Sequence, residues 1–333
     1  MSKRELAATV LKRSGVLAIL EMLRSKPGIL IVNHHRVGDA STTRFDRDVF
    51  SASAEGFEMQ LKYFKRYFPI VAGEELEDLV SGRTPLRRTY IAITFDDGYI
   101  NDFRVSYPIL KANNCAGTFF LVPQYVGTSY VPWWDEIAYL VRNSTRSQIT
   151  LQTPVPITIS LAGNREDAIR SVLRHYKRPD NHDGERILQE LREQTGCTIP
   201  PTGRRFITWE EAREMREAGM AIGSHTQSHG ILGQMTPEAQ QWELRESRKN
   251  IEAAIGGEIT TLAYPVGIRG AFDETTEAIA RSLGYRMCFS FYGGINTPTH
   301  MQPMNLLRMA TNRDPLLFRA ETVLLSRLGR LPY

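Results

Sequence analysis

The sequence predicts an α/β fold, either a (β/α) barrel or an open parallel sheet, and three observations predict it. Short apolar segments recur along the chain, which is typical of parallel strands that are buried on both faces. Segments with helical spacing of their apolar residues lie between these strands. The chain has 333 residues, of which 42% are hydrophobic and 23% are charged, so it can form a sizeable core. We therefore expect one large domain over residues 28–333.

The expected strands and helices alternate along most of this domain. The strands are expected, in chain order, at residues 29–32, 90–95, 117–122, 220–224, 261–264, 286–291 and 306–310. Helices are expected at residues 58–68, 107–113, 236–255 and 273–283. Thr236 followed by Pro237 is typical of a helix start, and Gly256 and Gly284 are typical of helix ends.

Residues 143 to about 204 interrupt this alternation. They are rich in Pro, Arg and Asn and contain one helical segment, residues 185–193, but no motif. We expect an insertion in the domain rather than a second domain with its own core. A lid or a specificity element are the roles that this composition leaves open.

Residues 1–27 are expected to form an amphipathic helix with Lys12, Arg13 and Arg24 beside apolar residues. Glu21 interrupts the apolar run, which is far shorter than the roughly 20 residues of a membrane span. No small-residue cleavage site follows it, so a secretory signal is not expected. Such a helix can lie on a membrane surface or pack on its own domain. The expected location is cytoplasmic, with peripheral contact at the inner membrane face as an option.

Charge and cysteine content narrow the class of protein. The chain has 41 Lys and Arg against 37 Asp and Glu, a net charge of +4, which does not favour nucleic acid as a partner. Its three cysteines, Cys115, Cys197 and Cys288, are far apart in the sequence, so neither a disulfide framework nor a thiolate metal site is expected. A reducing compartment fits this pattern.

Polar side chains follow three of the expected strands. Asp96 and Asp97 come directly after one strand, His225 follows another, and the segment YPVG at residues 264–267 follows a third. In both α/β architectures the carboxyl ends of the strands form the functional face. We therefore expect these residues at one rim of the fold.

The aspartates and histidines have a pattern that suits a metal ion. His225 and His229 are four residues apart, which on a helical turn places both on one side. Adjacent carboxylates repel each other, and a divalent cation would relieve that repulsion between Asp96 and Asp97. One aspartate can bind the ion while the other faces its bound water. Two histidines and one carboxylate with an open position predict a hydrolytic site, with zinc the commonest ion. A plain turn or a helix N-cap is the alternative for Asp-Asp-Gly.

Three segments, TFDDGY at 94–99, HTQSH at 225–229 and AYPVG at 263–267, occur in an order that resembles the polysaccharide deacetylase (NodB-homology) family. The resemblance covers residues 28 to about 312. It implies a deformed (β/α) barrel, usually of seven strands. It also implies metal-dependent removal of an N-acetyl group from an amino sugar.

The resemblance also implies roles for individual residues. Asp96 is implied as the general base. The implied ligands of one divalent ion, zinc or alternatively cobalt or nickel, are Asp97, His225 and His229. The backbone N–H of Val266 is implied as a donor to the oxyanion. Aromatic side chains can stack on sugar rings or can pack in the core. The residues expected to contact substrate are Tyr99, Trp134, Tyr264, Pro265, Val266 and Arg308.

The chain departs from the family pattern at two points. The third motif usually begins with an arginine that orients the base, but this chain has Ala263. Arg308 can supply that guanidinium or can form a structural salt bridge. The second departure is the absence of a late catalytic histidine.

The segment NHHRVGD at 33–39 offers a replacement for that histidine, because it resembles the branch that includes poly-N-acetylglucosamine deacetylases. In that branch the acid histidine comes from the first strand, and aligning HRV selects His35. A histidine bonded to a backbone carbonyl at the strand end is the alternative reading of this position.

These observations predict a metal-dependent amide hydrolase with an N-acetylated saccharide as its substrate. Removal of a formyl group from a lipid-linked amino sugar is an alternative within the same chemistry. A catalytically silent carbohydrate-binding module and a membrane-associated scaffold are alternatives from other classes.

Overall fold

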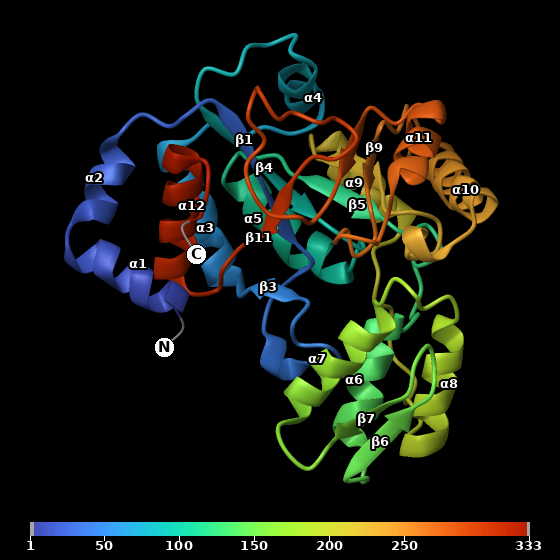
Figure 1. Ribbon diagram of the computed structural model, residues 1–333. Helices are drawn as coiled ribbons and strands as arrows, with labels where there is room; N and C mark the ends of the chain where they lie inside the picture. The colour runs from blue at the N-terminus through green and yellow to red at the C-terminus, as the bar shows by residue number, and fades with distance from the viewer. Residues whose placement is uncertain (1–2, 332–333) are drawn as a thin grey trace.

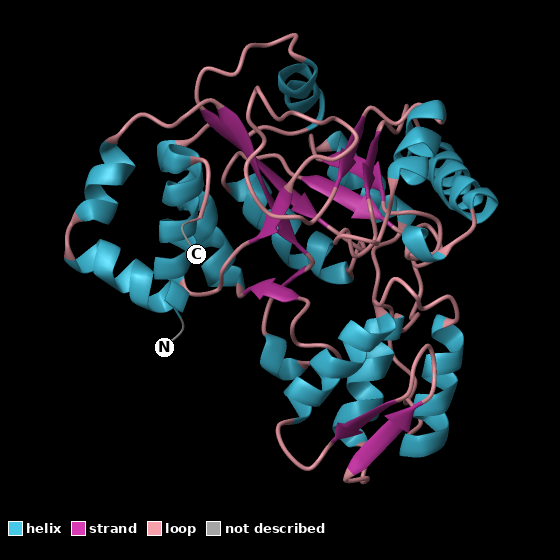
Figure 2. Ribbon diagram, in the orientation of Figure 1, coloured by secondary structure: helices cyan, strands magenta, loops and turns pink. Residues whose placement is uncertain are grey.

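A parallel sheet of seven strands forms the centre of the molecule and curves into a nearly closed barrel (Figures 1 and 2). This computed structural model describes residues 3–331. The strands are β1 (Gly28–His34), β4 (Thr89–Phe95), β5 (Thr118–Leu121), β8 (Ala221–Ser224), β9 (Thr261–Ala263), β10 (Met287–Phe289) and β11 (Arg308–Ala310). Their order is β10-β9-β8-β5-β4-β1-β11, and a parallel bridge between Phe289 and Leu306 links the two edges. The seven-stranded barrel is therefore confirmed, and each expected strand is present.

The inside of the barrel is apolar at one end and polar at the other. Alternate residues of a strand point inward. The apolar inward residues form a cluster with helix α4 (Gly73–Ser81), and its strand members include Ile29, Ile31, Ala92, Phe120, Met287 and Phe289. The next inward positions toward the carboxyl ends of β1 and β4 are Asn33 and Thr94, and both are buried. The strands therefore present polar side chains at the end that faces away from α4 (Figure 1).

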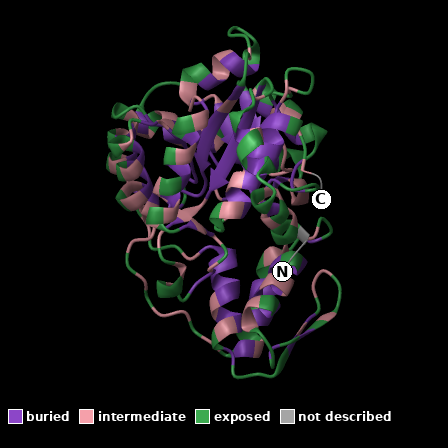
Figure 3. Cartoon of the chain, turned by 90° about the vertical axis from the view of Figure 1, so that its left-hand side faces the viewer, coloured by how far each residue is buried: buried purple, intermediate pink, exposed green. Residues whose placement is uncertain are grey.

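The remaining helices of the barrel cover its outer surface, so that the strands are almost entirely buried (Figure 3). They are α3 (Ala54–Tyr67), α5 (Tyr107–Ala112), α9 (Trp209–Glu217), α10 (Pro237–Ile255), α11 (Glu274–Ser282) and α12 (Pro315–Leu328). Two of these helices begin at the capping residues that the sequence predicted. The Thr236 side chain accepts a hydrogen bond from the N–H of Ala239 at α10, and Asp273 forms a capping box with Thr276 at α11.

Residues 1–27 were expected as one helix, but the described part contains two, α1 (Lys3–Arg13) and α2 (Val16–Met22). Gly15 separates them because its φ of 74° lies in the left-handed region, which ends α1. Both helices pack on α12 through a small apolar cluster that includes Ala8, Leu17 and Ala320. Within residues 3–331, no helix is long and apolar enough to cross a membrane.

A separate group of elements, which we call the lobe, extends from the barrel on the side opposite α4 (Figure 1). Its elements are α6 (Trp133–Asn143), the antiparallel pair β6 (Gln148–Leu151) and β7 (Ile157–Ser160), α7 (Arg165–Tyr176) and α8 (Gly184–Thr195). Since α6 packs on α7 and α8, the lobe begins at Trp133, earlier than the insertion expected near residue 143. A second short pair, β2 (Arg36–Val37) and β3 (Phe50–Ala52), follows β1 and frames the loop of residues 38–49.

Candidate active site

Three loops with an unusual backbone meet at the carboxyl ends of β4, β8 and β9. Within the described residues, five residues other than glycine have a positive φ. Four of them belong to these loops, namely Asp97, Thr226, His229 and Val266. Each such conformation costs of the order of 1–3 kcal/mol and persists only where the surroundings enforce it. This concentration of strain is typical of a functional site.

Asp97, His225 and His229 converge within this region. One Oδ1 atom of Asp97 lies 3.6 Å from Nε2 of His225 and 3.4 Å from Nε2 of His229. Ligands about 2.0–2.2 Å from a tetrahedral zinc ion are roughly 3.3–3.6 Å apart, so these distances fit one ion. The helical turn expected for residues 225–229 is absent. The left-handed backbone of Thr226 and His229 brings the two rings together instead.

The protonation of these groups also fits a cation. Nδ1 of His225 lies 2.7 Å from the carbonyl oxygen of Ala263, so Nδ1 carries the hydrogen and Nε2 keeps a free lone pair. Burial lowers the pKa of His225 to about 4, which keeps the imidazole neutral. Burial raises the pKa of Asp97, but the imidazole of His229, whose Nε2 lies 3.4 Å from Oδ1, outweighs it and holds that pKa below its usual range. Oδ1 of Asp97 is buried without a hydrogen-bond partner in residues 3–331, as expected of a metal ligand.

Asp96 has a different environment from its neighbour. Both of its oxygens accept hydrogen bonds from Arg308, at 2.7 and 2.9 Å, and Oδ2 also accepts one from Asn33 at 3.0 Å. Burial opposes ionisation of Asp96, but the charge of Arg308 outweighs it, so the pKa of Asp96 lies well below its usual range. The two aspartates are therefore both ionised, and only Asp97 is directed at both histidines. Arg308 itself is almost fully buried and lies beneath the site, behind Asp96.

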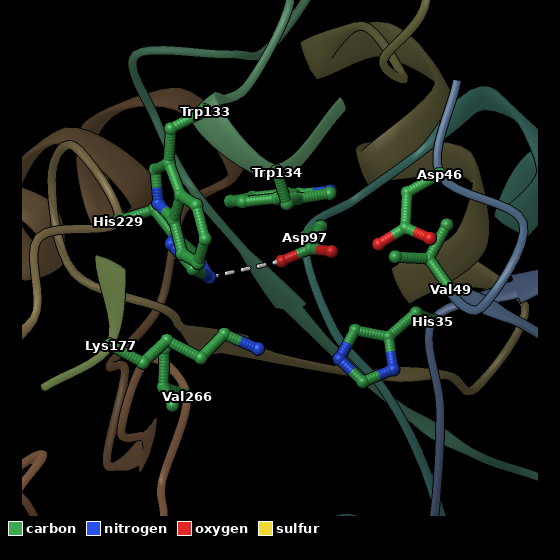
Figure 4. A pocket seen from close by; sticks show the side chains of 9 residues that line it. All are labelled: His35, Asp46, Val49, Asp97, Trp133, Trp134, Lys177, His229 and Val266. Carbon is green, nitrogen blue, oxygen red and sulfur yellow. Dashed lines mark ion pairs between the residues drawn. The ribbon is translucent and has the colours of Figure 1, made fainter. Parts of the chain in front are cut away.

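A pocket of about 380 Å³ opens above Asp97 and His229. His35 and Val266 line it, and the imidazole of His35 points into the same space as Asp97 (Figure 4). His34 points away from the pocket: it is fully buried against Phe57 and Phe95, and burial lowers its pKa to about 4. Of the two neighbouring histidines, only His35 can reach a substrate.

The expected aromatic contacts divide into two groups. Trp134 lines the pocket, with its ring centroid 4.5 Å from that of His229. Tyr99 is buried, stacks on Phe206 and accepts a hydrogen bond of 2.8 Å from Nε1 of Trp134, so it supports the pocket from behind. Tyr264 is also buried and donates its hydroxyl to the backbone oxygen of Met304. Neither tyrosine presents a face to the pocket.

Pro265 precedes Val266 in the loop after β9, and its carbonyl accepts a hydrogen bond of 2.6 Å from the N–H of Gly267. This bond closes a tight turn, and the turn directs Val266 toward the pocket. Pro265 therefore shapes the loop and does not itself line the pocket.

Sequence reasoning missed three polar residues of the site. Asn33 could have been found, because it shares the inward face of β1 with Ile29 and Ile31. Asp46, from the loop of residues 38–49, and Lys177, from the lobe, also line the pocket. No spacing or motif marks these two, since the fold brings them in from segments far from the catalytic motifs.

Comparison with known proteins gives one family. A family model described as polysaccharide deacetylase matches residues 83–288. YxkH of Bacillus subtilis (strain 168), which is named as a polysaccharide deacetylase, is 22% identical over 263 residues. The match covers 79% of this chain and 64% of YxkH, so the chain spans less than two thirds of the length of that relative.

Solved structures share the fold over almost the whole chain. The structure of IcaB from Ammonifex degensii has a TM-score of 0.61 at 18% identity, covering 90% of this chain and 98% of IcaB. The Streptococcus pyogenes deacetylase PplD in complex with acetate has a TM-score of 0.57 at 17% identity, covering 90% and 99%. At these identities the likeness concerns the fold alone.

We predict that the protein binds one zinc ion per chain and that His225→Ala abolishes this binding. Mutation of a residue that only supports a ligand typically lowers metal affinity by roughly 10–100-fold. Loss of a ligand itself should lower zinc affinity by more than that. Calorimetric titration of the metal-free protein with zinc measures the affinity directly. His300→Ala is the matched control, because His300 is exposed in a loop and contacts only threonines nearby. Unchanged zinc affinity in His225→Ala would contradict the assignment.

Proposed function

Because the chain belongs to the polysaccharide deacetylase family, we propose that it hydrolyses the N-acetyl amide of an amino-sugar-containing oligo- or polysaccharide. The observation that carries this proposal is the separation of roles between adjacent aspartates. Asp97 is directed at two imidazoles, whereas Asp96 is held by Arg308 and Asn33. Two carboxylates with a purely structural role would not need two histidines beside them at distances that suit a metal ion.

The residues of the site supply a complete hydrolysis. A divalent cation held by Asp97, His225 and His229 would polarise the amide carbonyl and lower the pKa of a bound water from about 15.7 to about 7. Asp96 accepts a proton from the water that attacks the carbonyl carbon. The N–H of Val266, which has no acceptor among the described residues, donates to the oxygen that becomes negative.

The carbon–nitrogen bond then breaks, and the departing nitrogen needs a proton. His35 is the histidine that faces the pocket without being one of the three clustered residues (Figure 4). With a proton from His35 the products are acetate and the free amine of the sugar. Trp134 offers an apolar ring beside His229, where the acetyl methyl group or a sugar face can pack.

We also propose that α1 and α2 dock on an anionic membrane surface. Half of the large apolar side chains that are exposed in residues 3–331 lie on these helices and the turn after them, namely Leu6, Val10, Val16, Ile19, Met22 and Leu23. Leu6 and Val10 are each two positions from buried Ala8, a rotation of about 200°, so they point away from α12.

The charge around this apolar surface favours lipid over another protein. Lys12, Arg13 and Arg24 are exposed beside it, and within residues 3–331 no carboxylate pairs with any of the three. Basic side chains near an anionic bilayer contribute about 1 kcal/mol each, and the apolar side chains enter the interface. A lipid-linked saccharide would then be presented to a docked enzyme.

Acetate release from N-acetylated chitooligosaccharides tests the main proposal. We expect zinc-dependent release by the unmodified protein and a drop of about 10²–10⁴-fold in Asp96→Asn, because that change removes the base. The asparagine still accepts from Arg308, so zinc binding should persist and shows that the site is intact. Asp39→Asn, at an exposed turn, is the control. Release of formate from a formylated analogue in place of acetate would redirect the proposal, and sugar binding without any hydrolysis would refute it.

His35→Ala should lower kcat by about 10²–10⁴-fold, the usual contribution of a general acid. The loss should be smaller with an activated ester substrate, whose leaving group needs no proton. Loss of a general acid should lower the rate on the amide much more than the rate on the ester. Loss of a residue that only supports the fold should lower both rates equally. A drop of less than roughly tenfold on the amide substrate would remove His35 from the mechanism.

The double variant Ile19→Gln/Met22→Gln should reduce binding to anionic vesicles by about tenfold or more, because two apolar side chains no longer enter the interface. Co-sedimentation with phosphatidylglycerol vesicles measures this, and neutral phosphatidylcholine vesicles should bind weakly throughout. Trp242→Gln is the matched control, since Trp242 is exposed on α10. Self-association without vesicle binding would assign the surface to a second copy instead.

A further inference from the structure

A second pocket, of about 580 Å³, is lined by Tyr99, which does not line the pocket above Asp97. Its walls come from the loop of residues 38–49 and from the segment that precedes α9. The side chains that matter for its charge are four arginines, so we call it the arginine pocket, defined by Arg36, Arg44, Arg204 and Arg205.

The arginine pocket carries an excess of positive charge. Arg205 pairs with Asp135, and Arg204 pairs with Glu211 at 2.5 and 2.7 Å. Arg36 and Arg44 have no carboxylate partner among the residues that the structure describes. Four guanidinium groups therefore face two carboxylates, which leaves two positive charges without compensation.

Asp102 is the remaining carboxyl group near Arg36, and it does not compensate this charge. Both of its oxygens are buried without a hydrogen bond. Burial raises the pKa of Asp102 well above its usual range, so its neutral form is favoured.

Unused donors accompany this charge. Nη1 of Arg36 and Nε of Arg205 are buried without a hydrogen-bond partner. A buried donor without a partner is unfavourable, so an acceptor brought next to either group would be favoured. Thr43 adds a hydroxyl whose oxygen accepts from the N–H of Phe45 at 3.2 Å, which leaves its hydrogen free to donate.

Aromatic rings fix the two innermost guanidinium groups in place. Arg36 lies 4.2 Å from the ring centroid of Phe50 and 4.8 Å from that of Tyr99, and Arg205 lies 4.0 Å from that of Phe45. Groups held in this way lose little freedom when a ligand binds. A planar guanidinium is also the side chain best suited to carboxylate or phosphate oxygens.

The arginine pocket shares its walls with the pocket above Asp97. Phe45 lines the former, and its neighbour Asp46 lines the latter. Tyr99 lines the arginine pocket, while its hydroxyl holds Trp134 in the wall of the other. The two pockets therefore adjoin, and a saccharide that extends from its acetylated sugar above Asp97 across this shared wall would bring a neighbouring group to the arginines.

We propose that the arginine pocket binds an anionic group of the saccharide, a carboxylate or a phosphate, next to the sugar that loses its acetyl group. This inference rests on the proposed deacetylase function and names a class of substrate for it. The carboxylate would come from a uronic acid in the chain, and the phosphate from a glycosyl phosphate.

Substrates with and without the anionic group test the proposal. The test compares kcat/KM for hyaluronan oligosaccharides, or for N-acetylglucosamine 1-phosphate, with kcat/KM for a neutral chitooligosaccharide. We expect this ratio to fall about tenfold or more in Arg44→Gln, because hydrogen bonds between charged groups are the strong ones. Arg44→Lys should retain part of the preference. Arg174→Gln, an exposed arginine of the lobe that bonds only to Ser171, should leave the ratio unchanged.

The pattern of losses identifies the source of the charge. A loss confined to hyaluronan assigns a uronate, and a loss confined to the sugar phosphate assigns a phosphate. An unchanged ratio for both substrates in Arg44→Gln and in Arg36→Gln would overturn the proposal.

A second measurement separates this inference from the proposed function. Calorimetric titration with inorganic phosphate should show binding that weakens in Arg44→Gln, whether or not the protein hydrolyses any acetylated sugar. Phosphate binding without acetate release would refute the deacetylase proposal and keep the anion site. Acetate release with no phosphate binding and no preference for anionic substrates would refute the anion site and keep the deacetylase proposal.

Discussion

Asp96 and Arg308 form a bidentate ion pair inside the barrel, where both side chains are almost fully buried. Removing one partner from such a pair costs about 3–5 kcal/mol, because the other charge stays buried and unpaired. Asn33 completes a ring, since its amide donates to Asp96 and its oxygen accepts from Arg308 at 2.9 Å. Asn33 lies in β1 and Arg308 in β11, and Asp96 directly follows β4; these three strands are neighbours in the sheet. The interaction that fixes the candidate base therefore also ties three strands together at their carboxyl ends.

This ring explains how the chain tolerates its departure from the family pattern. Ala263 stands where an arginine is usual, and it packs in the barrel interior. The guanidinium comes instead from β11, which approaches Asp96 across β1. The family model ends at residue 288, before β11, and begins at residue 83, after β1. Arg308 and His35, the candidates for the two groups that the core motifs lack, therefore both come from segments outside the matched region.

The sequence predicted the strands well because their signals are local, whereas the barrel was implied only by the family resemblance. Seven apolar segments became seven strands, and the Thr236 and Asp273 signals began the helices that they mark. It failed where structure depends on distant contacts. The two histidines converge through left-handed residues and not through a helix, and this backbone is stable only because the surrounding loops enforce it. Asp46 and Lys177 reach the pocket only through tertiary packing, so no local pattern could identify them.

The positions of Asp46 and Lys177 indicate how reactivity and substrate selectivity are separated in the fold. The candidate reacting groups lie directly after barrel strands whose positions are set by a dense hydrogen-bonded interior, and strands hold geometry more accurately than loops do. The side chains that would meet the rest of a substrate come from the lobe and from the loop of residues 38–49. Segments of this kind tolerate insertion and substitution with little effect on the core. Substitutions in these outer segments can therefore change which sugar or anionic substituent is bound. The arrangement of Asp96, Asp97 and the imidazoles stays fixed, because the buried ring around Arg308 does not depend on the outer segments.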